Sequence, residues 1–192
     1  MKKLNALVLG LLISGSVFAQ TKWGLDKAHS NVVFAVTHMT VAETTGSFKE
    51  YDVNVTSPSD DFNGADVVFT AKTASINTEN ERRDGHLKSP DFFDAEKYPE
   101  IKFAGKLVKE AGKYQLRGKL TVKDVTKDVA FDVTYKGTLK TAQFTKAGFK
   151  LVGKIDRFDY NLTWDKTVEA GGGLVVGKEV EFTANIELNL AK

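Results

Sequence analysis

Hydrophobic and polar residues alternate over most of the chain, and they do so most regularly in its second half. In the segment 113–122, Leu116, Leu120 and Val122 share one face of an extended chain, and polar side chains occupy the positions between them. Successive side chains of a β-strand point to opposite faces, so a period of two indicates a strand buried on one side. The pattern therefore predicts antiparallel strands with one face in water.

Segments of this kind recur along the whole chain. Eight strands are predicted, at residues 29–38, 46–57, 65–76, 100–108, 113–122, 128–138, 147–157 and 179–190. Phe48 is out of phase with Tyr51, which indicates a bulge near Lys49 and Glu50. Eight strands close a barrel wide enough to hold one small ligand. The predicted fold class is therefore all-β, an eight-stranded antiparallel barrel.

One interruption of the alternation predicts a short helical insert near residues 78–94. Thr78 followed by Glu81 has the spacing of a capping box, which would open a helix that runs to Leu87. Ser89-Pro90-Asp91 fits the start of another helical turn that contains Phe92 and Phe93.

A second interruption lies at residues 158–178. Three consecutive glycines at 171–173 indicate a long loop before the last strand. No linker, repeat or block of like charge divides the chain, so we expect one domain over residues 20–192. A chain of this length can bury its own core without disulfides.

The first 19 residues have the features of a secretory signal peptide. Lys2 and Lys3 precede an apolar run from Leu4 to Ile13, and Ala19 ends a short cleavage motif. The alternative, a transmembrane anchor, needs about 20 apolar residues. The chain has no cysteine, so no lipid-modified cysteine would hold it to a membrane. We therefore expect removal of residues 1–19, release into the periplasm and no integral membrane span.

Composition narrows the function. Removing Lys2 and Lys3 from the 27 basic residues leaves 25, against 25 acidic residues, so the net charge predicts neither nucleic acid nor an anionic membrane as a partner. The absence of cysteine excludes thiol catalysis and cysteine-bound zinc. His29 and His38 would face opposite sides of one strand, so no metal or other cofactor is expected. The sequence contains no nucleophile-elbow, phosphate-loop or dinucleotide motif, and we expect no catalytic residues and no enzyme.

Several groups of residues resemble a known family. They are Trp23-Gly24-Leu25-Asp26 with His29-Ser30, then Ile76-Asn77-Thr78, Arg83-Asp84, His86-Leu87, Phe92-Phe93-Asp94 and Tyr98-Pro99, and finally Arg157, Asp159-Tyr160 and Trp164. With them, the chain from about Trp23 onward resembles the YceI-like family of lipocalin-like periplasmic proteins. Tyr160 departs mildly from the pattern, where the family often has Phe. The resemblance implies binding of polyisoprenoid or similar amphiphilic lipids, including quinone-type chains, inside the barrel. It also implies a homodimer, and no catalytic residues.

The ligand-binding residues expected for such a barrel are mostly apolar. The candidates for its lining are Phe34, Val36, Phe69, Phe92, Phe103, Leu120, Phe131, Val133, Phe149 and Leu151. His38, near a barrel rim, is a candidate hydrogen-bond partner for a lipid head group. Arg83 either receives the head group or forms a local ion pair with Asp84, and the sequence leaves both interpretations open.

Glycines recur on the apolar face, at Gly105, Gly118, Gly137 and Gly153. They either leave the interior unfilled for a ligand or permit the strands to coil. Three alternatives to an isoprenoid carrier remain open. The protein would instead bind other amphiphiles such as fatty acids, fatty amides or hydrophobic antibiotics, act on its lipid as an enzyme or stress-response scavenger, or form an outer-membrane barrel. The insert at residues 77–98 argues against the last, because it is not a short turn.

Overall fold

The computed structural model describes residues 20–166 and 174–191, so the predicted signal peptide and the glycines at 171–173 lie outside the described residues. The strands are β1 (Thr21–Leu25), β2 (Asn31–His38), β3 (Ala42–Phe48), β4 (Tyr51–Ser57), β5 (Asp66–Lys72), β6 (Ile76–Asn77), β7 (Glu100–Glu110), β8 (Lys113–Val122), β9 (Val125–Lys140), β10 (Thr145–Asp156) and β11 (Val176–Leu190). The loop predicted at 158–178 begins with the 3-10 turn η3 (Arg157–Tyr160) and ends earlier than expected, where β11 starts.

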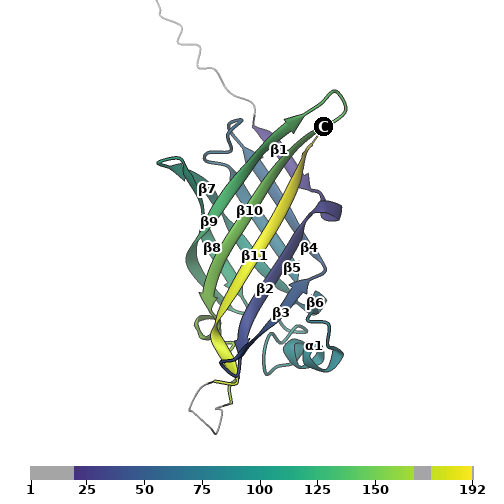
Figure 1. The fold of residues 1–192 in the computed structure, drawn as a ribbon, viewed down its shortest axis with the longest axis vertical. Helices are drawn as coiled ribbons and strands as arrows, with labels where there is room; N and C mark the ends of the chain where they lie inside the picture. The colour runs from purple at the N-terminus through teal and green to yellow at the C-terminus, as the bar shows by residue number, and fades with distance from the viewer. Residues whose placement is uncertain (1–19, 167–173, 192) are drawn as a thin grey trace, which may run out of the picture.

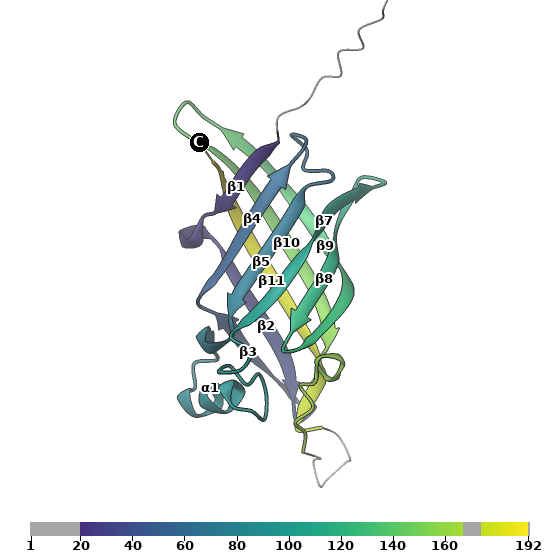
Figure 2. The same cartoon turned by 180° about the vertical axis from the view of Figure 1, so that it is seen from behind.

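These strands form one antiparallel sheet that closes on itself. Its closed part runs β1-β4-β5-β7-β8-β9-β10-β11, and β1 pairs again with β11 through Trp23 opposite Leu190. Figure 1 shows β9, β10 and β11 on one side of the barrel, and Figure 2 shows β4, β5, β7 and β8 on the other. The prediction of an eight-stranded antiparallel barrel with a short helical insert is confirmed.

At three places in the barrel wall, a turn or a bend divides what would otherwise be one long strand into two shorter ones. β1 and β2 both pair with β11, with the 3-10 turn η1 (Lys27–His29) between them, and the sequence did not predict β1. β3 and β4 flank a bend at residues 49–50, which is why Phe48 is out of phase with Tyr51. β5 and β6 flank the 3-10 turn η2 (Thr73–Ser75), so the strand predicted at 65–76 is not continuous.

The insert contains α1 (Glu81–Lys88), but the predicted capping box is wrong. The N-cap of α1 is Asn80, whose side chain accepts a hydrogen bond from the Arg83 backbone N–H. The Thr78 hydroxyl donates instead to Asp84, at 2.5 Å, and so does not cap the helix. Residues 89–97 form hydrogen-bonded turns rather than a second helical turn.

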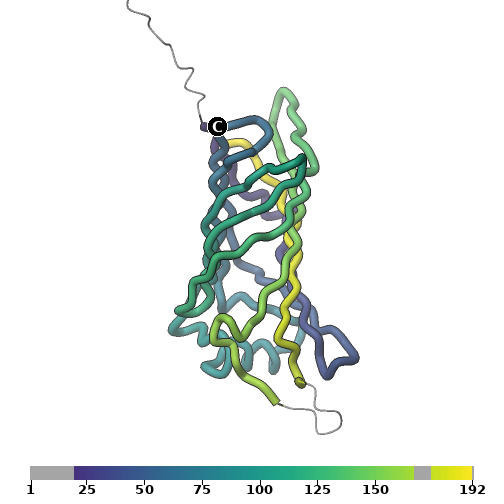
Figure 3. The backbone as a smooth tube through the Cα atoms, turned by 90° about the vertical axis from the view of Figure 1, so that its left-hand side faces the viewer, coloured from purple at the N-terminus to yellow at the C-terminus, as the bar shows by residue number. Residues whose placement is uncertain are grey.

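The barrel has two distinct ends. We call the end that carries α1 the insert end and the opposite end, where Leu190 lies, the C-terminal end (Figures 1 and 2). Figure 3 shows the strands running obliquely around an elongated barrel between these ends. Most of the buried apolar side chains point into the barrel, so the core and any internal cavity share one space.

Candidate functional site

A cavity of about 280 Å³ lies inside the barrel. Its wall includes Phe62 near the C-terminal end, Phe92 at the insert end, and inward-facing side chains of most of the strands between them. Among the described residues, Arg157 is the one wall residue that is not apolar. The volume is close to the lower limit of the range for small-molecule sites, about 300–1,000 Å³.

The strands of the barrel do not border the open space equally. Inward side chains of β7 and β8, such as Phe103 and Leu116, are buried, whereas Phe34 of β2, Leu151 of β10 and Phe182 of β11 are only half-buried. Side chains inside a closed barrel keep accessible surface only where nothing packs against them. Val67 and Phe69 of β5 and Val133 of β9 are half-buried as well, so the unfilled volume is bounded by β2, β5, β9, β10 and β11 rather than by β7 and β8.

Phe62 lies at the C-terminal end of the cavity. It belongs to the loop between β4 and β5, is 1% exposed, and has a positive φ of 61°, which is rare for a bulky residue. Its ring centroid lies 5.0 Å from that of Trp23, 5.0 Å from Phe149 and 5.5 Å from Tyr135. These aromatic contacts hold Phe62 in place and close the cavity on this side.

The insert and the loop after η3 together cover the other end. Leu87, Phe92 and Phe93 contribute to the cavity wall. The rings of His86, Phe92 and Trp164 pack on one another with centroids 5.0–5.2 Å apart. Asp84 is the one side chain that α1 itself buries, so the insert is held by these aromatic contacts and by polar bonds rather than by an apolar helix face.

Arg157 is the functional-site residue that sequence reasoning missed as part of the wall. It is 3% exposed, and its guanidinium donates hydrogen bonds to the backbone carbonyls of Leu162, Trp164 (2.8 Å), Val176 (2.9 Å) and Gly177 (2.9 Å). Burial lowers the pKa of Arg157, and the charges of Asp165 and Asp156 oppose that shift. The side chain joins the loop after η3 to the start of β11 and so fixes the insert end.

The ten apolar residues predicted to line the barrel all line this cavity. Their contact with a bound lipid stays a prediction. The two polar candidates lie elsewhere. His38 ends β2, is half-buried and does not contribute to the wall. Arg83 is exposed, and its guanidinium donates to the Thr78 hydroxyl and to the Thr78 carbonyl, each at 2.7 Å. A head-group role for these two residues remains an expectation that the position of the cavity does not favour.

Arg83 and Asp84 do not form the ion pair that the sequence left open. Within the described part of the chain, the Asp84 carboxylate accepts from the Thr78 hydroxyl and from the Thr78 backbone N–H at 2.8 Å, while Arg83 contacts the same threonine from its other side. Thr78 thus connects the two charged residues. The three residues fix the first turn of α1 to the chain that leaves β6.

The inward glycines make room for aromatic rings, a role that neither of the two interpretations left open by the sequence describes. Gly105 and Gly118 lie opposite each other on β7 and β8, and a Cβ on either would meet the Phe103 ring at 2.7–2.8 Å. A Cβ on Gly153 would meet the rings of Phe131 and Phe182 at 2.6–2.7 Å. Gly137 differs, because its φ of +117° is a conformation that favours glycine.

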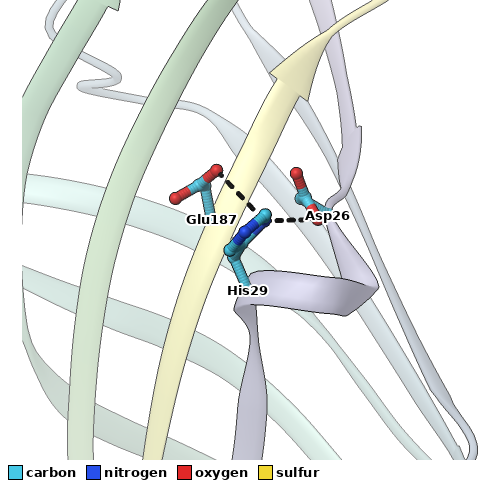
Figure 4. A group of neighbouring side chains, drawn as sticks. All are labelled: Asp26, His29 and Glu187. Carbon is cyan, nitrogen blue, oxygen red and sulfur yellow. Dashed lines mark ion pairs between the residues drawn. The ribbon is translucent and has the colours of Figure 1, made fainter.

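A separate polar cluster lies outside the cavity (Figure 4). Asp26, His29 and Glu187 hold three potential metal-ligating atoms within 4.8 Å of one another. The Lys146 ammonium lies 2.6 Å from both carboxylates and supplies the positive charge there. The hydrogen bond that Lys146 donates to the Asp26 carboxylate holds the pKa of Asp26 well below the usual range of an aspartate. The cluster therefore ties η1 and its N-cap Asp26 to β10 and β11 as an ion-pair network.

Across residues 20–166 and 174–191, no helix is both long and apolar enough to cross a membrane. The family model described as the YceI-like domain matches residues 23–188. A UPF0312 protein of Staphylococcus aureus (strain MSSA476) is 36% identical over 176 residues, which make up 90% of this chain and 99% of the relative.

Solved structures share the fold. A Campylobacter jejuni YCEI protein is 33% identical, with a TM-score of 0.69 over 88% of this chain and 97% of that chain. Burkholderia cenocepacia BcnA is 24% identical, with a TM-score of 0.70 over 85% of this chain and 98% of that one. A polyisoprenoid binding domain from Saccharophagus degradans is 14% identical, with a TM-score of 0.64 over 88% of this chain and 98% of that chain. The family model over residues 23–188 and the 36% identity with the Staphylococcus aureus relative show that the chain belongs to the YceI-like family.

Proposed function

We propose that this protein is a non-enzymatic lipid-binding protein that holds a long apolar chain of the isoprenoid type, polyprenyl or quinone-like, inside its barrel. The observation that carries the proposal is the cavity, whose wall is apolar apart from Arg157. Four hydrogen bonds direct the Arg157 guanidinium to backbone carbonyls, which leaves the cavity little to offer a polar ligand. Such a wall recognises hydrocarbon.

The shape of the site favours an extended cargo. Five inward residues of β11 line the cavity at alternate positions from Val180 to Leu188. Eight residue steps at about 3.3 Å each span about 26 Å along the strand. Burial of each cargo methylene contributes about 0.8 kcal/mol, so a few five-carbon units give tight binding without a polar contact. The solved Saccharophagus degradans structure, described as a polyisoprenoid binding domain, supports an isoprenoid rather than another tail.

The proposal includes the compartment and the purpose. After removal of residues 1–19, the protein would act in the periplasm in transport, storage or sequestration of its lipid. The alternative cargo is another amphiphile, such as a fatty acid, a fatty amide or a hydrophobic antibiotic, because an apolar wall discriminates weakly among tails. The head group would lie outside the apolar part of the cavity, and the homodimer implied by the resemblance stays a prediction.

Mass spectrometry of organic extracts from the purified protein tests the cargo. We expect an isoprenoid-type lipid in near-stoichiometric amount. The delipidated protein, titrated with prenyl alcohols of increasing length, should then bind each longer chain more tightly until the cavity is full. An extract without any apolar molecule, together with no binding of prenyl alcohols, would refute the proposal. Tighter binding of straight-chain fatty acids than of prenyl alcohols of equal carbon number would favour the alternative cargo.

A further inference from the structure

The tip of the hairpin of β9 and β10 projects beyond its neighbouring strands, farther on the β9 side than on the β10 side. β8 accompanies β9 only as far as Val133, which pairs with Tyr114, and β11 accompanies β10 only to Lys146, which pairs with Asn189. β9 and β10 nevertheless continue to pair with each other up to Lys140 opposite Thr145. Figure 1 shows this hairpin at the C-terminal end of the barrel. We call residues 134–150 the β9–β10 hairpin.

The tip of the β9–β10 hairpin exposes two large apolar side chains. Leu139 is 59% exposed and Phe144 is 44% exposed. They flank the short turn in which the Thr141 backbone N–H donates to the Phe144 carbonyl at 2.9 Å. Both side chains therefore lie at the outermost part of the molecule at this end, where no other strand covers them.

The same hairpin is strongly basic. Residues 134–150 contain four lysines, and the wider range 133–155 contains a fifth, Lys154, with no acidic residue in either range. Lys146 and Lys154 pair with carboxylates of other segments. Lys136, Lys140 and Lys150 are exposed and make no ion pair with any described residue. The insert at the opposite end, residues 78–98, contains six acidic and four basic residues, so the hairpin and the insert carry net charges of opposite sign.

We propose that the β9–β10 hairpin docks the protein on an anionic lipid bilayer, with Leu139 and Phe144 inserted at the interface, Lys136 and Lys140 among the lipid head groups, and Lys150 facing the anionic surface from the barrel wall. Exposed apolar side chains flanked by lysines are the combination that binds such surfaces, and each lysine near the surface strengthens binding about fivefold. A second copy of the chain is a poorer occupant, because two hairpins of this charge would repel each other.

Docking at this hairpin places the Phe62 end of the cavity against the bilayer. Tyr135 of β9 and Phe149 of β10, at the base of the hairpin, are two of the residues that hold Phe62 in place. The surface that recognises the bilayer is thus continuous with the aromatic cluster that closes the cavity. The docking itself does not require the cargo proposed above, and vesicles without isoprenoid lipid test it separately.

Sedimentation with phosphatidylcholine vesicles containing 30% phosphatidylglycerol tests the proposal, with pure phosphatidylcholine vesicles as the reference. We expect binding to the anionic vesicles only, weakened strongly by 1 M salt. The triple change K136Q/K140Q/K150Q should weaken the partition coefficient by at least about 25-fold, the contribution of Lys136 and Lys140 alone. The matched triple K88Q/K97Q/K166Q removes the same charge at the insert end and should leave binding within about twofold of the unchanged protein.

The apolar contribution is tested with L139S/F144S, for which we expect at least a tenfold loss of binding. M39S/V41S changes two exposed apolar residues of the β2–β3 turn and is the matched control. The fluorescence of F144W should shift to shorter wavelength on anionic vesicles. Equal losses from both lysine triples, no binding to anionic vesicles, or a dimer that L139S/F144S disrupts would each overturn the proposal.

Discussion

The substitution Ala184→Leu tests the internal cavity most directly. Ala184 lies in β11 between Leu151 of β10 and Val32 of β2, both of which are half-buried, and it lines the cavity. Leucine adds three carbons that would occupy positions otherwise taken by cargo. At about 0.8 kcal/mol per buried carbon, the loss is about 2.4 kcal/mol, or roughly 50-fold in affinity.

The stability of the cargo-free protein provides the second half of this test. In a close-packed core, three extra carbons destabilise the fold by about 1–3 kcal/mol. In an open cavity the same carbons are buried without strain, so we expect an unchanged or higher free energy of unfolding. The two effects together, weaker cargo binding and undiminished stability, distinguish a cavity from a solid core.

The assay is a titration of delipidated protein with a prenyl alcohol, accompanied by urea unfolding of the same samples. Ala130→Leu, on the exposed outer face of β9, adds the same three carbons outside the barrel and should change neither quantity appreciably. A folded Ala184→Leu protein with unchanged affinity, or one destabilised by more than about 1 kcal/mol, would refute the cavity reasoning.

Three further predictions concern stability. Phe62→Ala should lower the free energy of unfolding by about 3–5 kcal/mol, measured in urea, because it leaves a void inside the aromatic cluster. Arg157→Lys keeps the charge but has fewer donors, and it should cost about 1–3 kcal/mol for a buried carbonyl left unpaired; Arg82→Lys, on the exposed face of α1, is its control. The pKa of Asp26 is lowered in the folded protein, so its contribution to stability is complete above the unfolded pKa of about 4 and is lost as pH falls below it. Lys146→Met should flatten this acid loss between urea midpoints at pH 5 and pH 3.

Each of these has a contradicting result. A Phe62→Ala protein as stable as the original would mean that the ring is not packed as described. Equal effects of Arg157→Lys and Arg82→Lys would remove the role of the buried guanidinium in joining the η3 loop to β11. An acid loss that persists unchanged in Lys146→Met would show that other carboxylates control it.

The long strands could be predicted from the sequence, because apolar and polar residues that alternate over about ten positions fit few structures other than a β-strand. Most of the places where the strands are interrupted by turns could not be predicted in this way. β1 has only five residues, too few for a period to stand out, and η1 separates it from β2. Thr78 and Asn80 both qualify as helix caps by residue type, and the choice between them depends on Asp84, whose carboxylate engages the Thr78 hydroxyl.

The apolar wall was predictable for the same reason as the strands, since inward positions follow from the period of two. The role of Arg157 was not, because its partners are backbone carbonyls, which every residue possesses. The structural role of the inward glycines also could not be predicted, because it depends on tertiary structure. Whether a missing Cβ leaves open space or admits a neighbouring ring depends on rings such as Phe103 and Phe182, which come from other positions or other strands.

The pairing of Trp23 in β1 with Leu190 in β11 has a consequence for how the molecule folds. The contact that closes the barrel joins the two ends of the described chain, and pairings so distant in sequence form slowly. A chain emerging during synthesis has β1 well before its last strand. Until then its apolar interior is exposed to water and to other chains, so this interval is when the protein is most open to aggregation.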